Sequence, residues 1–514
     1  MKVTRRTVVT GAAGLLASPV LGRLIGPSRA LAQPAPRFLA ATMNEPDTLD
    51  LTSTRSRPVS EVALRNIAEM LWGYAADGSV VPTVADWDAS PDGKVITFKI
   101  HPGVKFHSGD ELTAEDVVFS QARSTARAPT YVRHARYVDK VEALDKYTAR
   151  FTFKRPDVGF FDGNELFLVS KAYYDRVGEQ QFVSRPSGVG PYRMTDYRQG
   201  QYMDLVRFDD YYGKKPQIES ARIYFIIDDV ARLNKLKAGE VDIIMGVPYS
   251  QVAALTQAGF DTVRLPANPT VSLGFDLVNV KTPWHDLRVR KAIAHAIDTN
   301  SIVNKLFQGV AVYYPYLAPG EAGYDPTLKG YDYDLAKAKA LLAEAGYANG
   351  FKMPLYYLAN SYYGFRDTAE AVALFVRAIG IECDIRSMEY VKWSEFVRKL
   401  TTDPNGEFTG IGPAPIANSG LSTTEMLTIS FSSRSPYALH KSAALDAKID
   451  AALGELDPVK RSQDVADALR IVNAELPSIT LWDTVSVYGS KRNVHYTPTQ
   501  HRMPSLQLRQ ITLS

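Results

Sequence analysis

The chain has 514 residues, enough for more than one packed core, because single hydrophobic cores stop growing at about 250–300 residues. Hydrophobic residues make up 45% and charged residues 22%, a balance that excludes a disordered chain and a membrane bundle. The formal net charge is only +3, and no basic stripe follows the N-terminal segment, so we expect no nucleic-acid partner.

Residues 1–32 have the composition of an export signal. Arg5 and Arg6 precede a weakly apolar run rich in Ala and Gly, and Ala30-Leu31-Ala32 supplies small residues for cleavage. The arginine pair favours twin-arginine export, and a Sec signal is the alternative. Five of the 59 basic residues and none of the 56 acidic residues lie in this segment, so the mature chain has a net charge of about −2.

The first elements expected in the mature chain are a strand at 38–42 and an amphipathic helix at 61–74. A hairpin follows around Pro91 and Gly93, which favour a tight reversal before the alternating strand 95–100. Thr113 then starts a helix. A second hairpin at 141–153 completes a small, mostly antiparallel subdomain.

The run Pro186–Tyr192 contains two glycines, but it lacks the third glycine and the following helix that a phosphate loop needs. Strands are expected at 221–227, 243–244 and 263–275, and a short helix at 230–237. Asp286 caps a helix with one apolar face. Arg288 and Arg290 of this helix are interpreted as a solvated face, and an anion site is the alternative.

The next unit alternates strand, helix and strand at 355–358, 372–380 and 381–385, which predicts a parallel pair in an α/β lobe. Cys383, the only cysteine, is expected as a buried strand residue. Helices are expected at 335–345, 445–456 and 465–476, and residues 479–482 carry the chain back to the first lobe.

The stretch from Asp86 to Phe119 resembles, nearly residue for residue, the signature of the large periplasmic solute-binding proteins of the peptide, dipeptide and nickel class, which deliver ligands to ABC transporters. The Gly-Pro-Tyr turn at 190–192 and Gly239–Asp242 also match. The resemblance covers roughly the whole mature chain and implies an α/β, two-lobed periplasmic binding protein fold of the large class, with an extra subdomain and two crossover strands between the lobes.

These expectations divide the chain into an export signal at 1–32, lobe I at 33–268 with the extra subdomain at about 60–182, lobe II at 269–478, and a return to lobe I at 479–514. The hinge is predicted near Pro266–Val271 and Ile479–Val485.

A cleft that recognises a small solute needs aromatic walls and a few polar anchors. In relatives, the passage after the first strand runs beside the cleft, and an arginine at the start of the lobe II crossover helix can meet a ligand carboxylate. An ordinary polar turn and a solvated helix start are the alternatives at these two places. The ligand-binding candidates are Asn44, Glu45, Tyr249, Phe275, Tyr362, Arg366, Asn418 and Trp482.

One departure from the family narrows the ligand. Peptide binders carry a Trp- and Asp-rich loop in which an Asp holds the α-amino group, whereas the comparable stretch 410–419 contains no acid. Burying an ammonium without a carboxylate costs several kcal/mol. The sequence therefore favours a ligand without a free ammonium, such as a modified peptide, a sugar-like solute or another small organic acid.

No catalytic motif or metal-ligand spacing is found, so we predict no catalytic residues, no metal site and no cofactor. The hypothesis is a monomeric, non-enzymatic periplasmic receptor that captures a small-molecule ligand between its lobes and delivers it to the permease subunits of an ABC transporter. A nickel or metal-chelate binder of the same family, an exported hydrolase, and a chaperone-like or adhesive surface protein are the alternatives.

Overall fold

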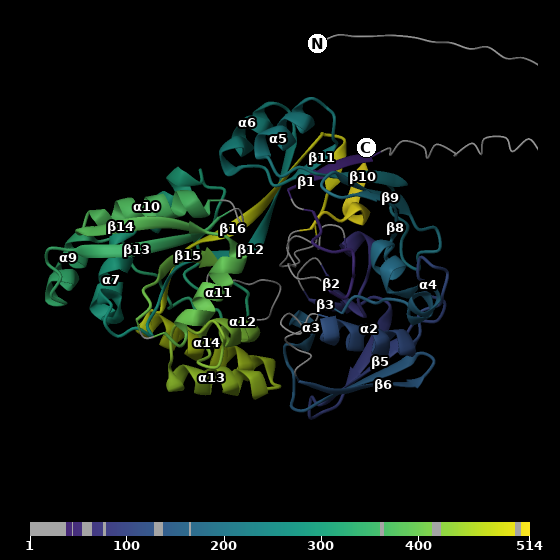
Figure 1. The fold of residues 1–514 in the computed structure, drawn as a ribbon, viewed down its shortest axis with the longest axis horizontal. Coiled ribbons are helices and arrows are strands. Elements are labelled where there is room, and N and C mark those ends of the chain that lie inside the picture. The colour runs from purple at the N-terminus through teal and green to yellow at the C-terminus, as the bar shows by residue number, and fades with distance from the viewer. Residues whose placement is uncertain are drawn as a thin grey trace, which may run out of the picture. The chain divides into compact units, whose positions relative to one another are not determined.

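A ten-stranded mixed sheet organises the protein, in the order β14-β13-β15-β12-β16-β11-β1-β10-β9-β8 (Figure 1). The computed structural model describes residues 38–43, 45–53, 64–75, 79–127, 137–163, 166–359, 364–403, 405–413, 423–498 and 505–514. The strands of this sheet are β1 (Phe38–Thr42), β8 (Tyr192–Arg198), β9 (Tyr202–Arg207), β10 (Ser220–Phe225), β11 (Ile243–Met245), β12 (Asp261–Phe275), β13 (Phe351–Leu358), β14 (Ile381–Met388), β15 (Thr409–Pro413) and β16 (Ser478–Ser490).

The two long strands β12 and β16 pair with each other in antiparallel orientation, from Asp261 opposite Ser490 to Gly274 opposite Ser478. They join the strands on one side of the sheet to those on the other. The register shifts between Pro266 and Thr270 and again after Val271. The predicted hinge segments therefore lie opposite each other on one irregular ladder.

Helices cover this sheet because their apolar faces pack onto its strands. A continuous cluster of buried residues links α5 (Asp229–Lys237) and α6 (Val252–Gln257) to the three helices that pack on the other end of the sheet. These three are α7 (Leu287–Ala296), α9 (Leu335–Glu344) and α10 (Phe365–Arg377). The remaining helical turns here are η1 (Tyr249–Gln251), η2 (Pro283–His285), α8 (Thr299–Ser301) and η3 (Ile302–Leu306), and α11 (Tyr390–Leu400) follows β14.

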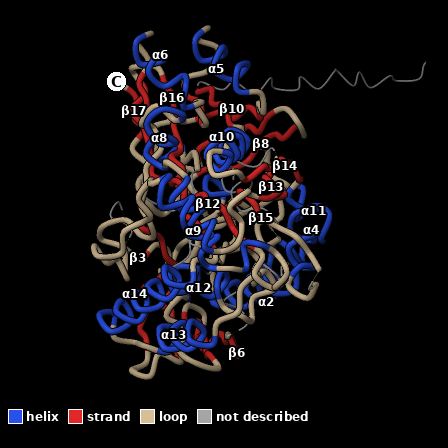
Figure 2. Tube along the Cα trace, turned by 90° about the vertical axis from the view of Figure 1, so that its left-hand side faces the viewer, coloured by secondary structure: helices blue, strands red, loops and turns tan. Residues whose placement is uncertain are grey.

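A separate apolar cluster holds three C-terminal helices together, α12 (Thr423–Phe431), α13 (Ala443–Gly454) and α14 (Pro458–Glu475). In the turned view of Figure 2, α12, α13 and α14 again lie together. The two long ones, α13 and α14, form a helical hairpin.

The predicted subdomain is present as a four-stranded antiparallel sheet in the order β4-β5-β7-β6. Its core is aromatic, with Phe98 between Trp72 and Phe151 at centroid distances of 5.9 and 5.5 Å. Its elements are β4 (Ala85–Ala89), β5 (Val95–Ile100), α2 (Ala114–Arg127), β6 (Val138–Asp145), β7 (Thr148–Phe153) and α3 (Phe160–Gly163). The rest of the first half adds β2 (Trp72–Tyr74), β3 (Val80–Pro82) and α4 (Lys171–Ser184), and the C-terminus adds β17 (Val494–Tyr496), η4 (Leu508–Gln510) and β18 (Ile511–Leu513).

Most predicted elements are confirmed, including both hairpins, the crossover β13-α10-β14 with its parallel pair, and the cap at Asp286. The helix expected over 61–74 is wrong beyond residue 67, because Trp72–Tyr74 is a strand that pairs with β3. The apolar residues of the segment 61–74 fit the period of a strand as well as that of a helix. Cys383 lies on β14 but is half-buried, since this strand is at the sheet edge.

The solvated interpretation of Arg290 is also wrong. Its side chain is only 6% exposed and donates to the carbonyls of Trp284, His285, Glu475 and Leu476. The guanidinium thus ties the start of α7 to the end of α14. Arg288, by contrast, is exposed and pairs with Asp286, as expected.

The glycines of the run Pro186–Tyr192, which was not predicted to be a phosphate loop, allow close packing. The Gly190 N–H donates to the Ile67 carbonyl at 2.9 Å, and a Cβ at Gly190 would lie 2.6 Å from that oxygen. Only a residue without a side chain allows this approach.

We therefore expect Gly190→Ala to lower the free energy of unfolding by about 1–3 kcal/mol, because the new methyl group meets backbone that cannot move aside. Gly454→Ala is the matched control, since a Cβ there meets nothing within 4 Å. Urea unfolding of both variants tests this. An equal midpoint for Gly190→Ala and Gly454→Ala would contradict the packing role.

Candidate functional site

The carboxyl ends of two groups of parallel strands converge on the middle of β16. On one side, β1 runs parallel to β10 and β11, and β11 ends at Met245, opposite Tyr488. On the other side, β15 ends at Pro413 next to Val271, which in turn pairs with Trp482. Ligands of open α/β sheets bind outside the carboxyl ends of parallel strands. The convergence at Trp482–Tyr488 is therefore the candidate site.

An aromatic cluster fills this crossing. The Trp482 ring lies 4.4 Å from that of Phe307 and 6.3 Å from that of Tyr249, which is itself 5.5 Å from Phe307. Trp482 is fully buried, and its indole N–H donates to the Thr368 hydroxyl at 3.0 Å. The cluster thus joins η1, η3, α10 and β16 at one place.

The start of α10 rests directly on these rings. Gly364 precedes the helix with a φ of 78°, and a Cβ there would lie 2.7 Å from Phe307 and 3.3 Å from Trp482. The bare glycine therefore lets the helix N-terminus approach the aromatic cluster.

The Tyr249 hydroxyl completes the edge of β16 beyond the end of β11. It donates to the Val485 carbonyl at 2.9 Å and accepts from the Val485 N–H at 2.8 Å. Burial raises the pKa of Tyr249 to about 12, so the hydroxyl keeps its proton. The Tyr249 side chain thus makes the two backbone hydrogen bonds that a residue of a neighbouring strand would otherwise make.

Further along this edge of β16, the backbone of Asp483 pairs with Val312. The Val312 N–H donates to the Asp483 carbonyl at 3.3 Å, and the Val312 carbonyl accepts from the Asp483 N–H at 2.7 Å. The Asp483 carboxylate accepts from the Thr270 hydroxyl across the register shift and from the Tyr314 N–H at 2.9 Å. Burial raises the pKa of Asp483 to about 7. Three segments therefore meet at a single buried carboxyl group.

The other predicted candidates lie in separate surroundings. Glu45 accepts hydrogen bonds from the Tyr197 hydroxyl and the Gly200 N–H, so it is held against the β8–β9 hairpin. Phe275 is 1% exposed, inside the main core at the end of β12. Arg366 is exposed and pairs with Glu370 at 2.9 Å, the helix-surface alternative to a ligand contact. Asn44, Tyr362 and Asn418 lie outside the described residues.

Phe307, Thr368 and Asp483 belong to the crossing, but the sequence did not single them out. Their only signal is their position, since Thr368 follows the arginine candidate by two residues and Asp483 follows Trp482. Phe307 stands far from both in the sequence, so only the fold brings it there.

Within the ranges that the structure describes, no three His, Cys, Asp or Glu side chains gather as a potential metal site. Likewise, none of the described helices combines the length and hydropathy needed to cross a lipid bilayer.

An α/β architecture in which two opposed sets of parallel strands share two crossing strands is the periplasmic binding protein fold. Residues 79–413 match the family model of the bacterial extracellular solute-binding proteins, family 5 (middle region). The chain therefore belongs to family 5 of the bacterial extracellular solute-binding proteins, a family of binding proteins.

Individual relatives agree. The chain is 27% identical to the glutathione-binding protein GsiB of Pectobacterium atrosepticum over 76% of this chain and 74% of that protein. It is 29% identical to the dipeptide-binding protein of Escherichia coli K12 over 62% of this chain and 65% of that protein. The crystal structure of NikA from Brucella suis in complex with Fe(III)-EDTA has a TM-score of 0.81 at 22% identity, covering 93% of this chain and 99% of that one.

Removing the Tyr249 hydroxyl leaves two buried backbone groups of Val485 without this partner, so we expect Tyr249→Phe to lower the free energy of unfolding by about 1–3 kcal/mol. Tyr333→Phe is the control, because Tyr333 is 47% exposed. Urea unfolding compares them. If the two variants unfold at the same midpoint, the hydroxyl does not stabilise the crossing.

Asp483 should make stability depend on pH. Its pKa is raised from 3.8 to about 7 in the folded chain, so between these values the folded state binds the proton more tightly than the unfolded state. The wild-type protein then loses stability as pH rises from about 4 to about 7. In Asp483→Asn both neighbouring groups keep a partner. The amide oxygen accepts from the Tyr314 N–H, and the amide N–H donates to the Thr270 hydroxyl, which can also accept.

We expect the stability of Asp483→Asn relative to wild type to increase over this pH range and to level off above it, as measured by urea unfolding at each pH. A constant difference between the two proteins would show that the carboxyl group does not titrate there.

Proposed function

We propose that the mature chain captures a small organic solute at the crossing of β12 and β16 and delivers it, unaltered, to the permease subunits of an ABC transporter. The observation that carries this proposal is the convergence of two opposed sets of carboxyl strand ends on Trp482–Tyr488. Family membership supports it.

The proposal divides the mature chain as the sequence suggested, with lobe I at 33–268 and 479–514 and lobe II at 269–478. The irregular pairing at Pro266–Val271 is where the strands can bend without breaking a regular ladder. Contacts with a solute that span both lobes exist only in the closed form, so binding shifts the population toward it.

For the ligand we propose a peptide-like or other organic solute without a free α-ammonium. The support is the composition of the stretch 410–419, which offers no carboxylate where peptide binders place one. A buried ammonium would then lack its counter-ion, at a cost of several kcal/mol. Relatives named for glutathione and for dipeptides support the peptide-like part of this proposal, whereas the absence of an ammonium is supported by the stretch 410–419 alone.

The remaining parts of the proposal concern the protein's setting. We propose that residues 1–32 direct export, by the twin-arginine route, that the mature chain acts in the periplasm as a monomer, and that it does not turn over its ligand. The adjacent Arg5 and Arg6 support the export route.

The test is a thermal-shift screen of the purified mature chain, because a ligand that binds only the native state raises the melting temperature. The matched pair is Ala-Ala and N-acetyl-Ala-Ala, with glutathione, a sugar, an opine and Ni²⁺ as further probes. We expect a solute without an ammonium, the acetylated peptide among them, to raise the melting temperature more than Ala-Ala does.

A larger shift with Ala-Ala would overturn the proposed ligand class but leave solute capture standing. A shift with Ni²⁺ alone would instead favour metal binding. Mass spectrometry of the bound compound after incubation distinguishes a receptor from a hydrolase, since only a hydrolase returns products.

A further inference from the structure

Two turns that are more than 350 residues apart in the sequence touch each other. One is the hairpin turn between β4 and β5, with Gly93 at its end, and the other joins α13 to α14. In Figure 1 their elements, among them α13, α14 and β5, lie well below the crossing of β12 and β16. A Cβ at Gly93 would lie 2.6 Å from Leu456 Cδ2 and 3.3 Å from Pro156 Cβ. The Leu456 side chain therefore rests on a bare glycine of the subdomain. We call Gly93, Pro156 and Leu456 the tip contact.

The glycine turn is rigidly built. The Gly93 N–H donates to the Ser90 carbonyl at 2.9 Å, and the Ser90 hydroxyl both donates to Asp92 at 2.6 Å and accepts from the Val95 N–H at 2.9 Å. Gly93 has a φ of 65°, which side chains rarely adopt. At Gly93 the turn therefore presents backbone without a side chain to Leu456.

The opposing turn is also fixed. The Arg461 guanidinium donates to the carbonyls of Glu455 and Leu456 at 2.9 and 3.3 Å. Asp457 caps α14 by accepting from the Val459 and Lys460 N–H groups. Leu456 is thus held in place by its own backbone.

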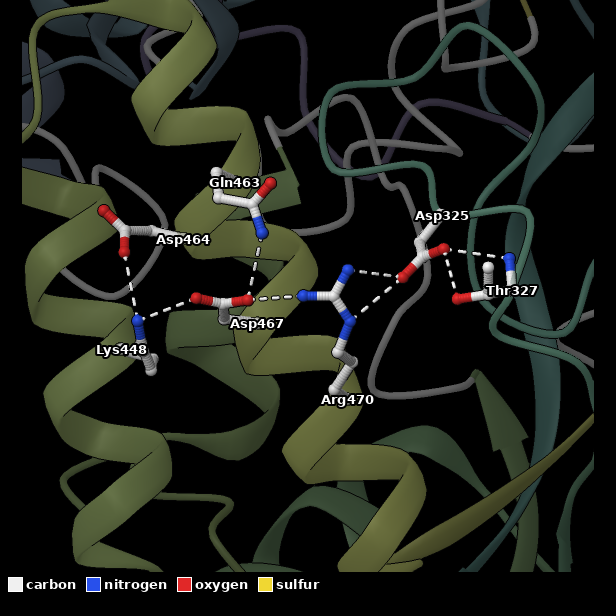
Figure 3. Close-up of polar contacts among 7 residues, drawn as sticks. All are labelled: Asp325, Thr327, Lys448, Gln463, Asp464, Asp467 and Arg470. Atoms are coloured by element: carbon white, nitrogen blue, oxygen red, sulfur yellow. Dashed lines mark hydrogen bonds and ion pairs between the residues drawn. The ribbon is translucent and has the colours of Figure 1, made fainter.

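The helical hairpin behind this turn is cross-linked by charges (Figure 3). Lys448 on α13 bridges Asp464 and Asp467 on α14 at 3.4 and 2.8 Å. Arg470 extends the network from Asp467 to Asp325, which Thr327 also holds. These ion pairs therefore hold α13 and α14 together next to the turn that carries Leu456.

Polar groups flank the tip contact. The Arg155 guanidinium lies 3.9 Å from the centre of the Tyr137 ring in the subdomain. On the other side, Arg434 pairs with Asp450 of α13, and the electrostatic influence of Tyr137 reaches its guanidinium. In Figures 1 and 2, α13 and β6 of the subdomain lie toward the same lower end of the molecule.

We propose that the tip contact is a latch that holds the two lobes together at the end remote from the hinge, and so sets the solute affinity without touching the solute. It rests on the two-lobed receptor proposed above, because the latch joins a turn of lobe I to a turn of lobe II. Leu456 keeps 42% of its surface exposed, so the contact is small and can open.

The latch acts through the closed population. The apparent dissociation constant of a solute that needs the closed form rises as the closed fraction falls. Truncating one half-buried leucine removes a fraction of its burial free energy, which corresponds to about a three- to tenfold loss of affinity through faster dissociation.

The first test compares Leu456→Ser with Val459→Ser, a second aliphatic residue of the same turn region that is 77% exposed. Lys99 and Lys460 are each replaced by a spin-labelled cysteine in a Cys383→Ser background. Pulsed electron paramagnetic resonance then measures the distance between the two labels in the ligand-free mature chain. We expect Leu456→Ser to shift the distribution to longer distances and Val459→Ser to leave it as in wild type. An unchanged distribution in Leu456→Ser would overturn the latch.

A pair of glycine variants separates contact from backbone strain. Gly93 and Gly103 both have positive φ values, 65° and 83°, but a Cβ at Gly103 meets nothing within 4 Å. We expect Gly93→Ala to widen the distance distribution and Gly103→Ala to leave it unchanged, and Gly93→Ala combined with Leu456→Ala to be no more open than Leu456→Ala alone. Equal opening by the two single variants would attribute the effect to strain and overturn the proposal.

These measurements need no solute, so a failed ligand screen leaves them valid. Conversely, solute binding with an unchanged distance distribution in Leu456→Ser removes the latch and keeps the receptor.

Discussion

The structure depends on the antiparallel ladder between β12 and β16, because these two strands join the two ends of the ten-stranded sheet. A long exposed strand edge at such a crossing would leave backbone N–H and C=O groups unpaired. The protein instead pairs the edge of β16 with three different groups: the end of β11, the hydroxyl of Tyr249, and Val312. Val485 and Asp483 are thus hydrogen-bonded along this edge beyond the end of β11, although the register of β16 with β12 is irregular.

The register shifts between β12 and β16 and the hydrogen bonding of the other edge of β16 have different consequences. In the proposed receptor, the register shifts near Pro266 and Thr270 are the place where the ladder bends, and the aromatic cluster around Trp482 connects α10 and Phe307 to β16. Asp483 contacts both sides of β16. Its carboxylate accepts from Thr270 of β12 at the register shift, and its backbone pairs with Val312 on the other edge.

The crossing and the tip contact lie at two ends of the same proposed cleft. A hinge alone fixes the direction in which two lobes move, whereas a contact at the far end decides how much of the time they are together. Because solute affinity scales with the closed fraction, residues at the tip can adjust it without changing the chemistry that recognises the solute. Rigid turns on both sides make such a contact specific, since neither can yield to avoid the other.

The sequence by itself determined the family, most of the strands and helices, and the two segments that pair as β12 and β16, because alternation, capping residues and turn residues act locally. It failed where one pattern suits two structures, as at Trp72–Tyr74, and where a charged side chain on a helix is buried by a distant segment, as Arg290 is by the end of α14. Only the tertiary structure decided that Tyr249 and Trp482 belong to a buried crossing, that Phe307 and Asp483 join them, and that Leu456 meets Gly93. These are contacts between residues far apart in the chain, and local patterns carry no record of which distant surface a side chain will meet.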